Sequence, residues 1–278
     1  MSPTGEGDAI VTLSDVAKTY DNGTQALERI DLAIRDGEFV TLVGPSGCGK
    51  STLLHLVAGL SRPSSGRIEW WGGPFDETGG PGRRIGLVFQ SPTLMPWASV
   101  AANVRLPLDL AHVARPDANA AAAQALARVG LAAASARLPR QLSGGMRMRA
   151  SIARALVTNP DLLLMDEPFG ALDEFTRQRL ESELLELWSA QRVTVVFVTH
   201  SIQEAVFLST RVVVMGAHPG RILDAMSVDE PYPRSDPFRL SPTFAALAQQ
   251  VSACVAKASA DALPDSAPAR ADVTRRKR

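Results

Sequence analysis

Two glycine-rich loops constrain the fold of this chain more than any other feature. The first, GPSGCGKST at 44–52, follows an apolar run at 38–44 and leads into a helical stretch at 50–59. The second, LSGGM at 142–146, opens a helical stretch at 144–158. A glycine loop that opens a helix presents backbone N–H groups and the positive end of the helix dipole to a phosphate. The pair predicts two half-sites that must meet.

The composition indicates a globular protein without the charge of a nucleic-acid binder. The chain has 278 residues, 45% of them hydrophobic and 21% charged, enough for one large core with or without a small lobe. Its 29 basic and 29 acidic side chains balance, so it lacks the broad positive field that binds a phosphate backbone, and we expect no nucleic-acid partner. Cys48 and Cys254 are too few for a disulfide framework, which favours a reducing compartment.

Neither a membrane span nor an export signal is predicted. A span needs about 18 to 20 consecutive apolar residues, and no run approaches that length. The N-terminal segment MSPTGEGDAI lacks the basic and apolar regions of a secretory signal. At the other end, residues 260–278 hold too few large apolar side chains to pack, and we expect a disordered tail.

Hydrophobic patterning predicts an α/β fold with a largely parallel sheet. Short runs rich in Val, Leu and Ile have the pattern of strands buried on both faces, at 38–44, 84–90, 161–167, 194–200 and 211–217. Helical stretches alternate with these runs at 50–59, 144–158, 174–190 and 201–208. Near the N-terminus, alternating apolar and polar residues predict a small antiparallel side sheet from segments 10–20, 26–34 and 65–73.

Two further regions are predicted to be helical. Residues 98–141 are alanine-rich and form a short-helix insertion, which with the next helix makes a helical subdomain at about 98–158. The insertion has apolar positions at Leu126, Val129 and Leu131 and is expected to be interrupted at Pro107, Pro116 and Pro139. After a proline-rich segment, a last amphipathic helix is indicated by Phe244, Leu247, Val251 and Val255. We therefore expect a main domain at 8–235 and a helical extension at 236–259.

Polar residues stand where the first four predicted strands end. These ends carry the glycine loop, Gln90, Asp166 with Glu167, and His200. The carboxyl ends of parallel strands share one edge of a sheet, where ligands of α/β folds bind. Taken singly, Gln90 or His200 would be an ordinary loop residue, but their shared placement favours a site.

The first loop matches the GxxxxGK[ST] pattern of a phosphate-binding loop. Lys50 would neutralise the β- and γ-phosphates, and the Ser51 hydroxyl would bind Mg²⁺. The alternative is an ordinary glycine turn, but strand, loop, Lys-Ser and helix follow in the order that the motif requires. The candidate nucleotide-binding residues of this loop are Gly44, Pro45, Ser46, Gly47, Cys48, Gly49, Lys50, Ser51 and Thr52.

Two adjacent carboxylates end the strand LLLMDE, and side chains that alternate along a strand point in different directions. Asp166 would hold Mg²⁺, usually through water, and Glu167 would act as the general base on the attacking water. The alternative is an exposed acidic turn, but here Pro168 stops the strand at the expected nucleotide edge.

The second loop begins a predicted helix whose apolar positions face one side. Ser143 would cap this helix, and the N–H groups of Gly144 and Gly145 would form an anion site. Taken alone, SGG before a helix is usually only an N-cap. The anion site therefore depends on the other motifs.

These residues resemble the ATP-binding subunits of ABC transporters. GPSGCGKST is similar to the Walker A loop, VFQSP to the Q-loop, LSGGM to the signature, LLLMDE to the Walker B strand, GALD to the D-loop and VTH to the H-loop. Order and spacing agree across about residues 8–225. The resemblance implies a P-loop NTPase fold, with a mostly parallel core sheet, a small antiparallel β subdomain and an α-helical subdomain, within an ABC ATPase domain at 8–235.

The resemblance also implies a homodimer whose two subunits pair head to tail. Each ATP, with Mg²⁺, would lie between one subunit's GPSGCGKST and the other's LSGGM. Tyr20 would stack on adenine, although it could instead pack on its own sheet. Gln90 would reach Mg²⁺ and the attacking water, and His200 would contact the γ-phosphate. Asp173 would help to couple the paired sites.

Several positions are similar to one branch of this family, the importers of nitrate, sulfonate and taurine type. Met146 and Ser201 stand where Gln and Asp are commoner, and Met148 replaces a frequent Gln. The segments QSPTLMPW at 90–97 and VTHSIQEAVFL at 198–208 also resemble that branch. The resemblance implies an ATP-hydrolysing subunit on the cytoplasmic face of the inner membrane, bound to transmembrane permease subunits. An extracytoplasmic solute-binding protein would capture the solute, so this chain would act on it only indirectly.

Other interpretations stay open at this point. An ABC-type ATPase acting on chromosomes would have long coiled-coil insertions, and one acting on ribosomes two tandem ATP domains; this chain shows neither pattern. A P-loop kinase would need an acceptor site and no LSGGM. Leu94, Met95 and Trp97 could dock a permease helix or pack inside the helical insertion. The segment after 225 is too short for an added β-rich regulatory domain.

Overall fold

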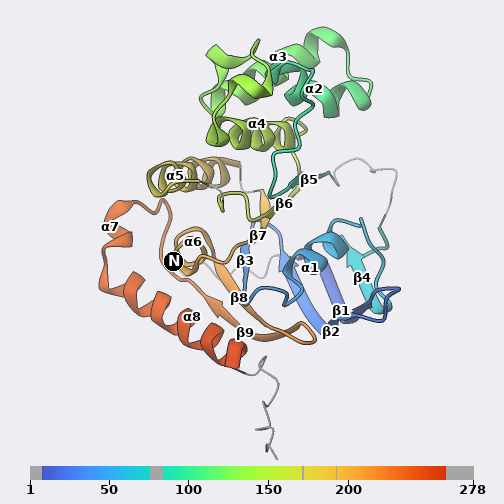
Figure 1. The fold of residues 1–278 in the computed structure, drawn as a ribbon, viewed down its shortest axis with the longest axis vertical. Coiled ribbons are helices and arrows are strands. Elements are labelled where there is room, and N and C mark those ends of the chain that lie inside the picture. The colour runs from blue at the N-terminus through green and yellow to red at the C-terminus, as the bar shows by residue number, and fades with distance from the viewer. Residues whose placement is uncertain (1–7, 76–83, 171, 192, 261–278) are drawn as a thin grey trace, which may run out of the picture.

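The computed structural model describes residues 8–75, 84–170, 172–191 and 193–260, and it consists of two sheets with helices around them and a helical subdomain at one end (Figure 1). Ala260 ends the last helix, so residues 261–278 of the predicted tail lie outside the described residues. None of the described helices is both long and apolar enough to cross a membrane.

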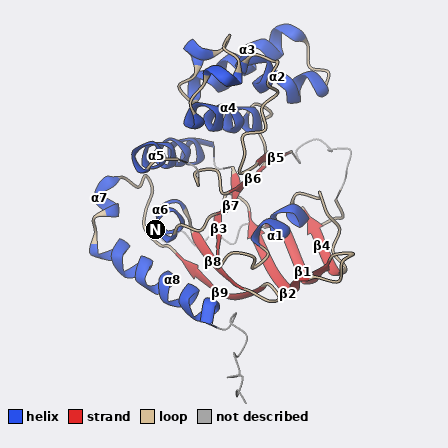
Figure 2. Ribbon diagram, in the orientation of Figure 1, coloured by secondary structure: helices blue, strands red, loops and turns tan. Residues whose placement is uncertain are grey.

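The larger sheet has six strands in the order β5-β6-β7-β3-β8-β9 (Figure 2). They are β3 (Phe39–Val43), β5 (Ile85–Val88), β6 (Leu162–Asp166), β7 (Thr194–Val198), β8 (Arg211–Gly216) and β9 (Arg221–Ser227). The five predicted strands are confirmed and run parallel, whereas β9 pairs antiparallel with β8. The patterning misses β9 because most of its side chains are exposed and it has no apolar run.

Register brings the ends of the parallel strands to one edge. Leu42 in β3 pairs with Val198 in β7 on one side and with Val213 in β8 on the other. Both faces of β3 are covered: Leu42 belongs to one hydrophobic core, and Phe39 and Val43 belong to the other. The unbroken apolar run at 38–44 follows from this burial on both faces.

The smaller sheet is antiparallel, as the alternation predicts, with strand order β2-β1-β4. Its strands are β1 (Ala9–Thr19), β2 (Gln25–Arg35) and β4 (Ser65–Trp70). Their inward side chains share one core with helix α1 (Lys50–Val57) and one face of the larger sheet. This core supports the glycine loop from below, because the loop connects β3 to α1.

A layer of helices packs on the opposite face of the larger sheet (Figure 2). It contains α4 (Gly144–Leu156), α5 (Glu174–Gln191), α6 (Ile202–Leu208), α7 (Asp236–Arg239) and α8 (Pro242–Ala260). Buried Arg234 ties the segment before α7 to the end of α6, since its guanidinium donates to the carbonyl oxygens of Phe207 at 3.0 Å and Ser209 at 2.8 Å. These bonds satisfy carbonyl groups that the end of a helix leaves free.

The helical subdomain has a hydrophobic core of its own. It comprises α2 (Val100–Leu110), α3 (Arg115–Arg128), two 3₁₀ turns (Ala132–Ala134 and Pro139–Gln141) and α4. The expected interruption at Pro107 is wrong, because α2 runs through that residue. A proline inside a helix removes one backbone hydrogen bond, and the burial of Val104 and Leu108 in this core offsets that loss.

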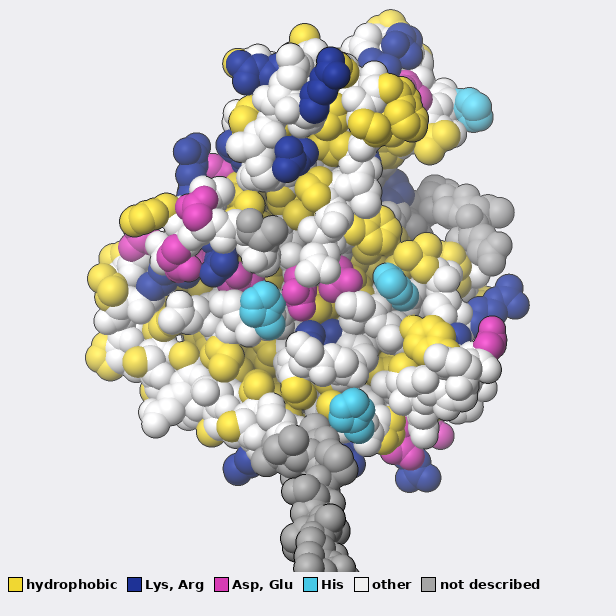
Figure 3. Space-filling view, in the orientation of Figure 1, with side chains coloured by type: hydrophobic (Ala, Val, Ile, Leu, Met, Phe, Trp, Pro, Cys, Tyr) yellow, Lys and Arg dark blue, Asp and Glu magenta, His cyan; other side chains and the backbone are white. Residues whose placement is uncertain are grey.

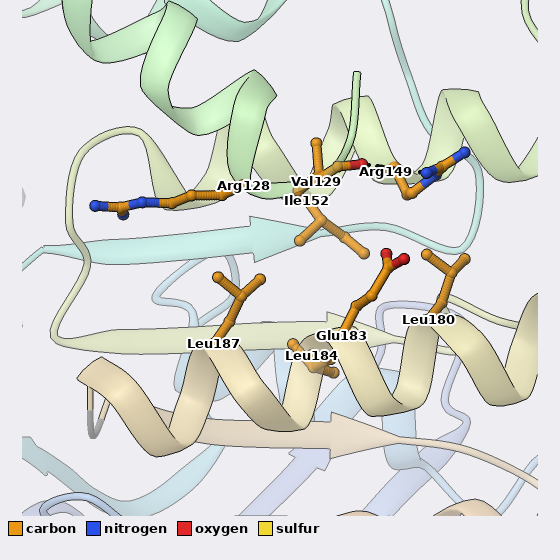
Figure 4. A pocket seen from close by; sticks show the side chains of 8 residues that line it. All are labelled: Arg128, Val129, Arg149, Ile152, Leu180, Glu183, Leu184 and Leu187. Atoms are coloured by element: carbon orange, nitrogen blue, oxygen red, sulfur yellow. Dashed lines mark hydrogen bonds between the residues drawn. The ribbon is translucent and has the colours of Figure 1, made fainter. Parts of the chain in front are cut away.

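A small crevice lies between the helical subdomain and α5 (Figure 4). Its lining is largely apolar and consists of Arg128, Val129, Arg149, Ile152, Leu180, Glu183, Leu184 and Leu187. None of these lining residues is a predicted nucleotide-binding or catalytic residue. The crevice therefore marks the boundary between α4 and α5 and is not a candidate nucleotide site.

Candidate functional site

The first glycine loop packs tightly on the core and leaves bare backbone at the surface. At Gly44, a Cβ would lie 2.3 Å from the carbonyl oxygen of Met215, so a side chain cannot fit. Gly47 has a φ of +79°, and no atom lies within 4 Å of the position that its Cβ would take. Gly47 therefore provides both the left-handed turn and an open approach to the backbone N–H groups.

Lys50 places a buried ammonium group under this loop. Its Nζ donates to the carbonyl oxygens of Gly44 at 2.9 Å and Pro45 at 3.0 Å. Cys48 is buried beside it, and burial raises the pKa of the Cys48 thiol although Lys50 acts in the opposite direction. Because the thiol is neutral and points inward, only the backbone N–H of Cys48 can contact an anion. An ammonium group under exposed N–H groups suits a polyphosphate.

Ser51 and Asp166 join the start of α1 to the end of β6. The Ser51 hydroxyl donates to Oδ1 of Asp166 at 3.2 Å. Burial raises the pKa of Asp166, against the effect of this hydrogen bond. A hydroxyl and a carboxylate are hard oxygen donors of the kind that Mg²⁺ prefers, so the pair fits such an ion. Within the described ranges no three His, Cys, Asp or Glu side chains form a metal cluster.

Three strand ends meet at one carboxylate oxygen, Oε2 of Glu167. The Gln90 amide donates to it at 3.4 Å, and Nδ1 of His200 lies 3.3 Å from it. Glu167 has a φ of +42°, and its N–H donates to the carbonyl oxygen of Val198 at 2.9 Å, which fixes the turn after β6. Figure 3 shows acidic and histidine side chains near the middle of one face. Asp166 and Glu167 thus have different partners, but not through strand alternation: β6 ends at Asp166, and Glu167 lies in the left-handed turn that follows.

Tyr20 lies at the other side of the glycine loop. Its hydroxyl is 3.0 Å from Oγ1 of Thr52, and 42% of its surface is exposed. The ammonium of Lys18 lies 5.4 Å from the centre of its ring. An aromatic face that is open to solvent beside the phosphate-binding loop could receive a flat base.

The second glycine loop and Asp173 are not joined to this group. The Ser143 hydroxyl accepts the N–H of Met146 at 3.3 Å and caps α4. Oδ1 of Asp173 accepts the N–H of Thr176 at 3.0 Å, and hydrogen bonds from Thr176 lower the pKa of Asp173. Where the structure describes the chain, no hydrogen bond or ion pair connects Ser143 or Asp173 to the first loop. Both residues are exposed at the surface.

Three residues near His200 were missed from sequence: Thr199, Arg177 and Glu204. The Thr199 hydroxyl donates to Glu204 at 2.5 Å, and Arg177 forms an ion pair with Glu204 at 3.5 Å. Glu204 is almost completely buried. The available signal was an acid, Glu204, directly before the apolar run AVFL.

The fold and the first loop define a P-loop nucleotide-binding protein. The ABC transporter family matches residues 27–170. A Brucella abortus protein named for ATP binding is 47% identical over 241 residues, which cover 87% of this chain and 91% of that protein. The chain belongs to the ABC transporter family.

Two further relatives carry more specific names. A taurine import ATP-binding protein of Rhizobium johnstonii is 46% identical over 213 residues, covering 77% of this chain and 80% of that protein. An aliphatic sulfonates import ATP-binding protein of Bacillus licheniformis is 43% identical over 228 residues, covering 82% of this chain and 86% of that protein. The predicted resemblance to this branch is confirmed, and ATPases of chromosomes or ribosomes are not favoured.

Two solved structures share the fold. An ATP-binding cassette in a dimeric post-hydrolysis state, bound to ADP and Pi, has a TM-score of 0.70 at 33% identity, covering 78% of this chain and 98% of that chain. cbiO1 of Clostridium perfringens, part of the ABC transporter complex cbiONQ, has a TM-score of 0.73 at 28% identity, covering 88% and 99%. The predicted fold class is confirmed, as are ATP binding and the class of ATPase coupled to transport.

Proposed function

We propose that this chain is the ATP-hydrolysing subunit of an importer for a small anion or organic solute such as nitrate, a sulfonate or taurine. The observation that carries the proposal is the convergence of Gln90 and His200 on Glu167, next to the Ser51–Asp166 pair. The relatives named for taurine and aliphatic sulfonate import support the solute class.

Hydrolysis at this site is a matter of positioning and charge neutralisation. The loop from Gly44 to Thr52 binds the phosphates, and Lys50 exchanges its bonds to loop carbonyls for bonds to phosphate oxygens. Ser51, Asp166 through water, and Gln90 would hold Mg²⁺, which when bound neutralises the β- and γ-phosphate oxygens. Glu167 accepts the proton of the attacking water.

His200 lies beside the base and would contact the γ-phosphate. Its Nδ1 is 3.3 Å from Oε2 of Glu167, so its ring can also orient the carboxylate. Gln90 contacts the same oxygen from the neighbouring strand and would report the presence of nucleotide to the segment that follows it. The three side chains therefore act on one water molecule from three strands.

The second half of each site would come from another copy of the chain. The N–H groups of Gly144 and Gly145 at the start of α4, with Ser143, would bind the γ-phosphate held by the partner. Asp173 would contact the partner from the loop before α5. The dimeric solved structure bound to ADP and Pi supports a dimer, and the head-to-tail arrangement is proposed from the two half-sites.

The segment after Gln90 would dock the permease. Arg154 of α4 donates to the carbonyl oxygen of Thr93 at 2.9 Å, which anchors the segment to the helix of the second loop. Leu94 packs on the core of the helical subdomain, whereas Trp97 is 78% exposed. The segment therefore combines a packed residue with a free aromatic side chain, which suits a helix of a transmembrane subunit. The chain would lie peripherally on the cytoplasmic face of the inner membrane, linked to a solute-binding protein only through the permease.

Trp97→Ala should weaken association with the transmembrane subunits by about tenfold or more. An aromatic side chain that becomes buried when the partner binds contributes much of the binding energy of an interface. The measurement is co-purification of the tagged chain from its native membrane. Leu110→Ala, at the end of α2 and 71% exposed, is the matched control and should co-purify normally. Equal recovery of both variants would contradict docking through Trp97.

Uptake of labelled taurine, alkanesulfonate and nitrate by cells lacking the chain tests the solute class. Unchanged uptake of all three solutes would contradict the proposed class.

Tyr20→Ala should raise the Kd for ATP by about tenfold, the effect of removing a ring that stacks on a base. Tyr20→Phe keeps the ring and loses only the contact with Thr52, so its Kd should stay within about twofold of the wild type. Titration calorimetry with a non-hydrolysable ATP analogue measures both. A Tyr20→Ala chain that binds like the wild type would assign the ring to packing on its own sheet.

A further inference from the structure

A buried carboxylate that the hydrolytic steps do not use lies behind His200. Glu204 in α6 is 4% exposed, and its Oε2 accepts the hydroxyl of Thr199 at 2.5 Å. The Thr199 oxygen in turn accepts the N–H of Ser201 at 2.9 Å, and the Ser201 hydroxyl accepts the N–H of Glu204 at 3.3 Å. Glu204 therefore fixes the residues on both sides of His200.

The other carboxylate oxygen of Glu204 faces α5. Nε of Arg177 lies 3.5 Å from Oε1. Through Nη2 the same guanidinium donates to the carbonyl oxygen of Leu172 at 2.9 Å, and the backbone N–H of Arg177 donates to the carbonyl oxygen of Asp173 at 2.9 Å. Arg177 thus holds the loop that presents Asp173 at the surface.

The segment before α5 also passes close to His200. A Cβ built on Gly170 would lie 3.6 Å from Cε1 of His200, which is ordinary van der Waals distance. The segment before α5 therefore lies near the histidine, with room for only a small side chain between them.

Burial changes the titration of Glu204. Burial raises the pKa of Glu204 to about 7, Glu181 acts in the same direction, and Thr199, Arg177 and His200 oppose it. Since the folded chain binds this proton more tightly than the unfolded chain, the free energy of unfolding falls as pH rises from 4.5 towards about 7. The fold therefore favours the protonated form of Glu204 over the ionised form.

We propose that Glu204 and Arg177 are positioning residues that couple His200, at the γ-phosphate of one protomer, to the Asp173 loop and through it to the other protomer. This coupling depends on the roles proposed above for His200 and Asp173. When nucleotide displaces His200, Thr199 and Glu204 move with it, and Arg177 transmits the shift to Leu172 and Asp173. Hydrolysis would then depend on the Glu204–Arg177 contact although neither residue touches ATP.

The test is a double-mutant cycle on the full chain with Glu204→Gln, Arg177→Met and both together. Each single change should lower kcat about tenfold, leave KM for ATP within about twofold, and be no worse in combination, because the two residues act as one unit. At pH 8, Glu204→Gln should unfold at the same or a higher temperature than the wild type. Arg179→Met is the matched control, since Arg179 pairs with Glu183 on the same helix but is exposed, and its kcat should be unchanged.

The outcomes separate coupling from a structural role. The proposal would be overturned by an unchanged kcat in Glu204→Gln or by additive losses of kcat in the double variant. It would also be overturned if Glu204→Gln lost both kcat and Tm, or if Arg179→Met lost as much kcat as the two variants. If Arg177→Met does not fold, Glu204→Gln alone still tests the proposal, with Glu183→Gln as its control. The kcat, KM and Tm of these two variants are then compared. Glu167→Gln is assayed in parallel: if it keeps normal turnover, the proposed hydrolytic site has failed, whichever result the pair gives.

Discussion

Glu167→Gln is expected to lower steady-state ATP hydrolysis by about 10²- to 10⁴-fold, the usual contribution of a general base. The amide is nearly the same size and can still contact Gln90 and His200, but it cannot take a proton from water. The phosphate-binding loop is unchanged, so the Kd for ATP should stay within about twofold of the wild type. Uncleaved ATP should then hold two chains together as a dimer. Light scattering after addition of ATP and Mg²⁺ would detect this dimer.

A matched carboxylate controls for a general effect of the substitution. Glu69 in β4 forms an exposed ion pair with Arg67 at 3.1 Å and lies on the smaller sheet. Glu69→Gln should hydrolyse ATP like the wild type. Normal turnover in Glu167→Gln would refute the assigned base, and loss of ATP binding together with turnover would point to a damaged loop instead.

Ser143→Arg should also stop hydrolysis, for a different reason. The long cation would fill the space in which the N–H groups of Gly144 and Gly145 are to meet the γ-phosphate of the partner. Loss of the hydroxyl that accepts from Met146 costs about 1 kcal/mol of helix capping, too little to unfold the chain. Binding of ATP to the monomer should be unaffected, because no hydrogen bond joins Ser143 to the first loop within the described part of the chain.

Ser99→Arg separates the loss of a helix cap from the loss of an anion site. Ser99 caps α2 of the same subdomain by accepting the N–H of Ala102 at 3.2 Å. This control should lose similar stability but keep ATP hydrolysis. If Ser143→Arg weakened monomeric ATP binding and turnover equally, its role would lie within one subunit or in folding.

Mixing two inactive variants adds an independent check of Ser143. Lys50→Ala removes the ammonium of the first loop, and Ser143→Arg blocks the second. In a mixed dimer one site combines the intact Lys50 with the intact Ser143, so an equal mixture should recover about a quarter of wild-type hydrolysis if the two sites work independently. Either variant alone should remain inactive.

Local patterns were sufficient to predict the strands and loops that form the site. The run at 38–44 is apolar because both faces of β3 are buried, and the glycine loop follows it directly. Gln90, Glu167 and His200 were expected at one sheet edge because parallel strands end together, and the structure brings them to a single oxygen. In the segment after Gln90, Leu94 packs on the core of the helical subdomain and Trp97 is exposed. Both residues are large and apolar, so the sequence pattern could not tell which of them is buried.

Features that depend on tertiary contacts could not be predicted. β9 is an exposed edge strand whose pairing with β8 has no apolar signature. Pro107 stays helical because Val104 and Leu108 are buried against other helices, a fact that only the packed subdomain supplies. Glu204 and Arg177 are far apart in sequence, and their ion pair exists only because α5 and α6 pack together.

The central claim is that one protomer provides only part of each hydrolytic site. The most direct test is the rate of ATP hydrolysis per chain, measured across protein concentrations at which light scattering shows the change from monomer to dimer. The account predicts that this rate rises with the dimer fraction and approaches zero for the monomer. A rate per chain that stays at its full value where every molecule is monomeric would contradict it.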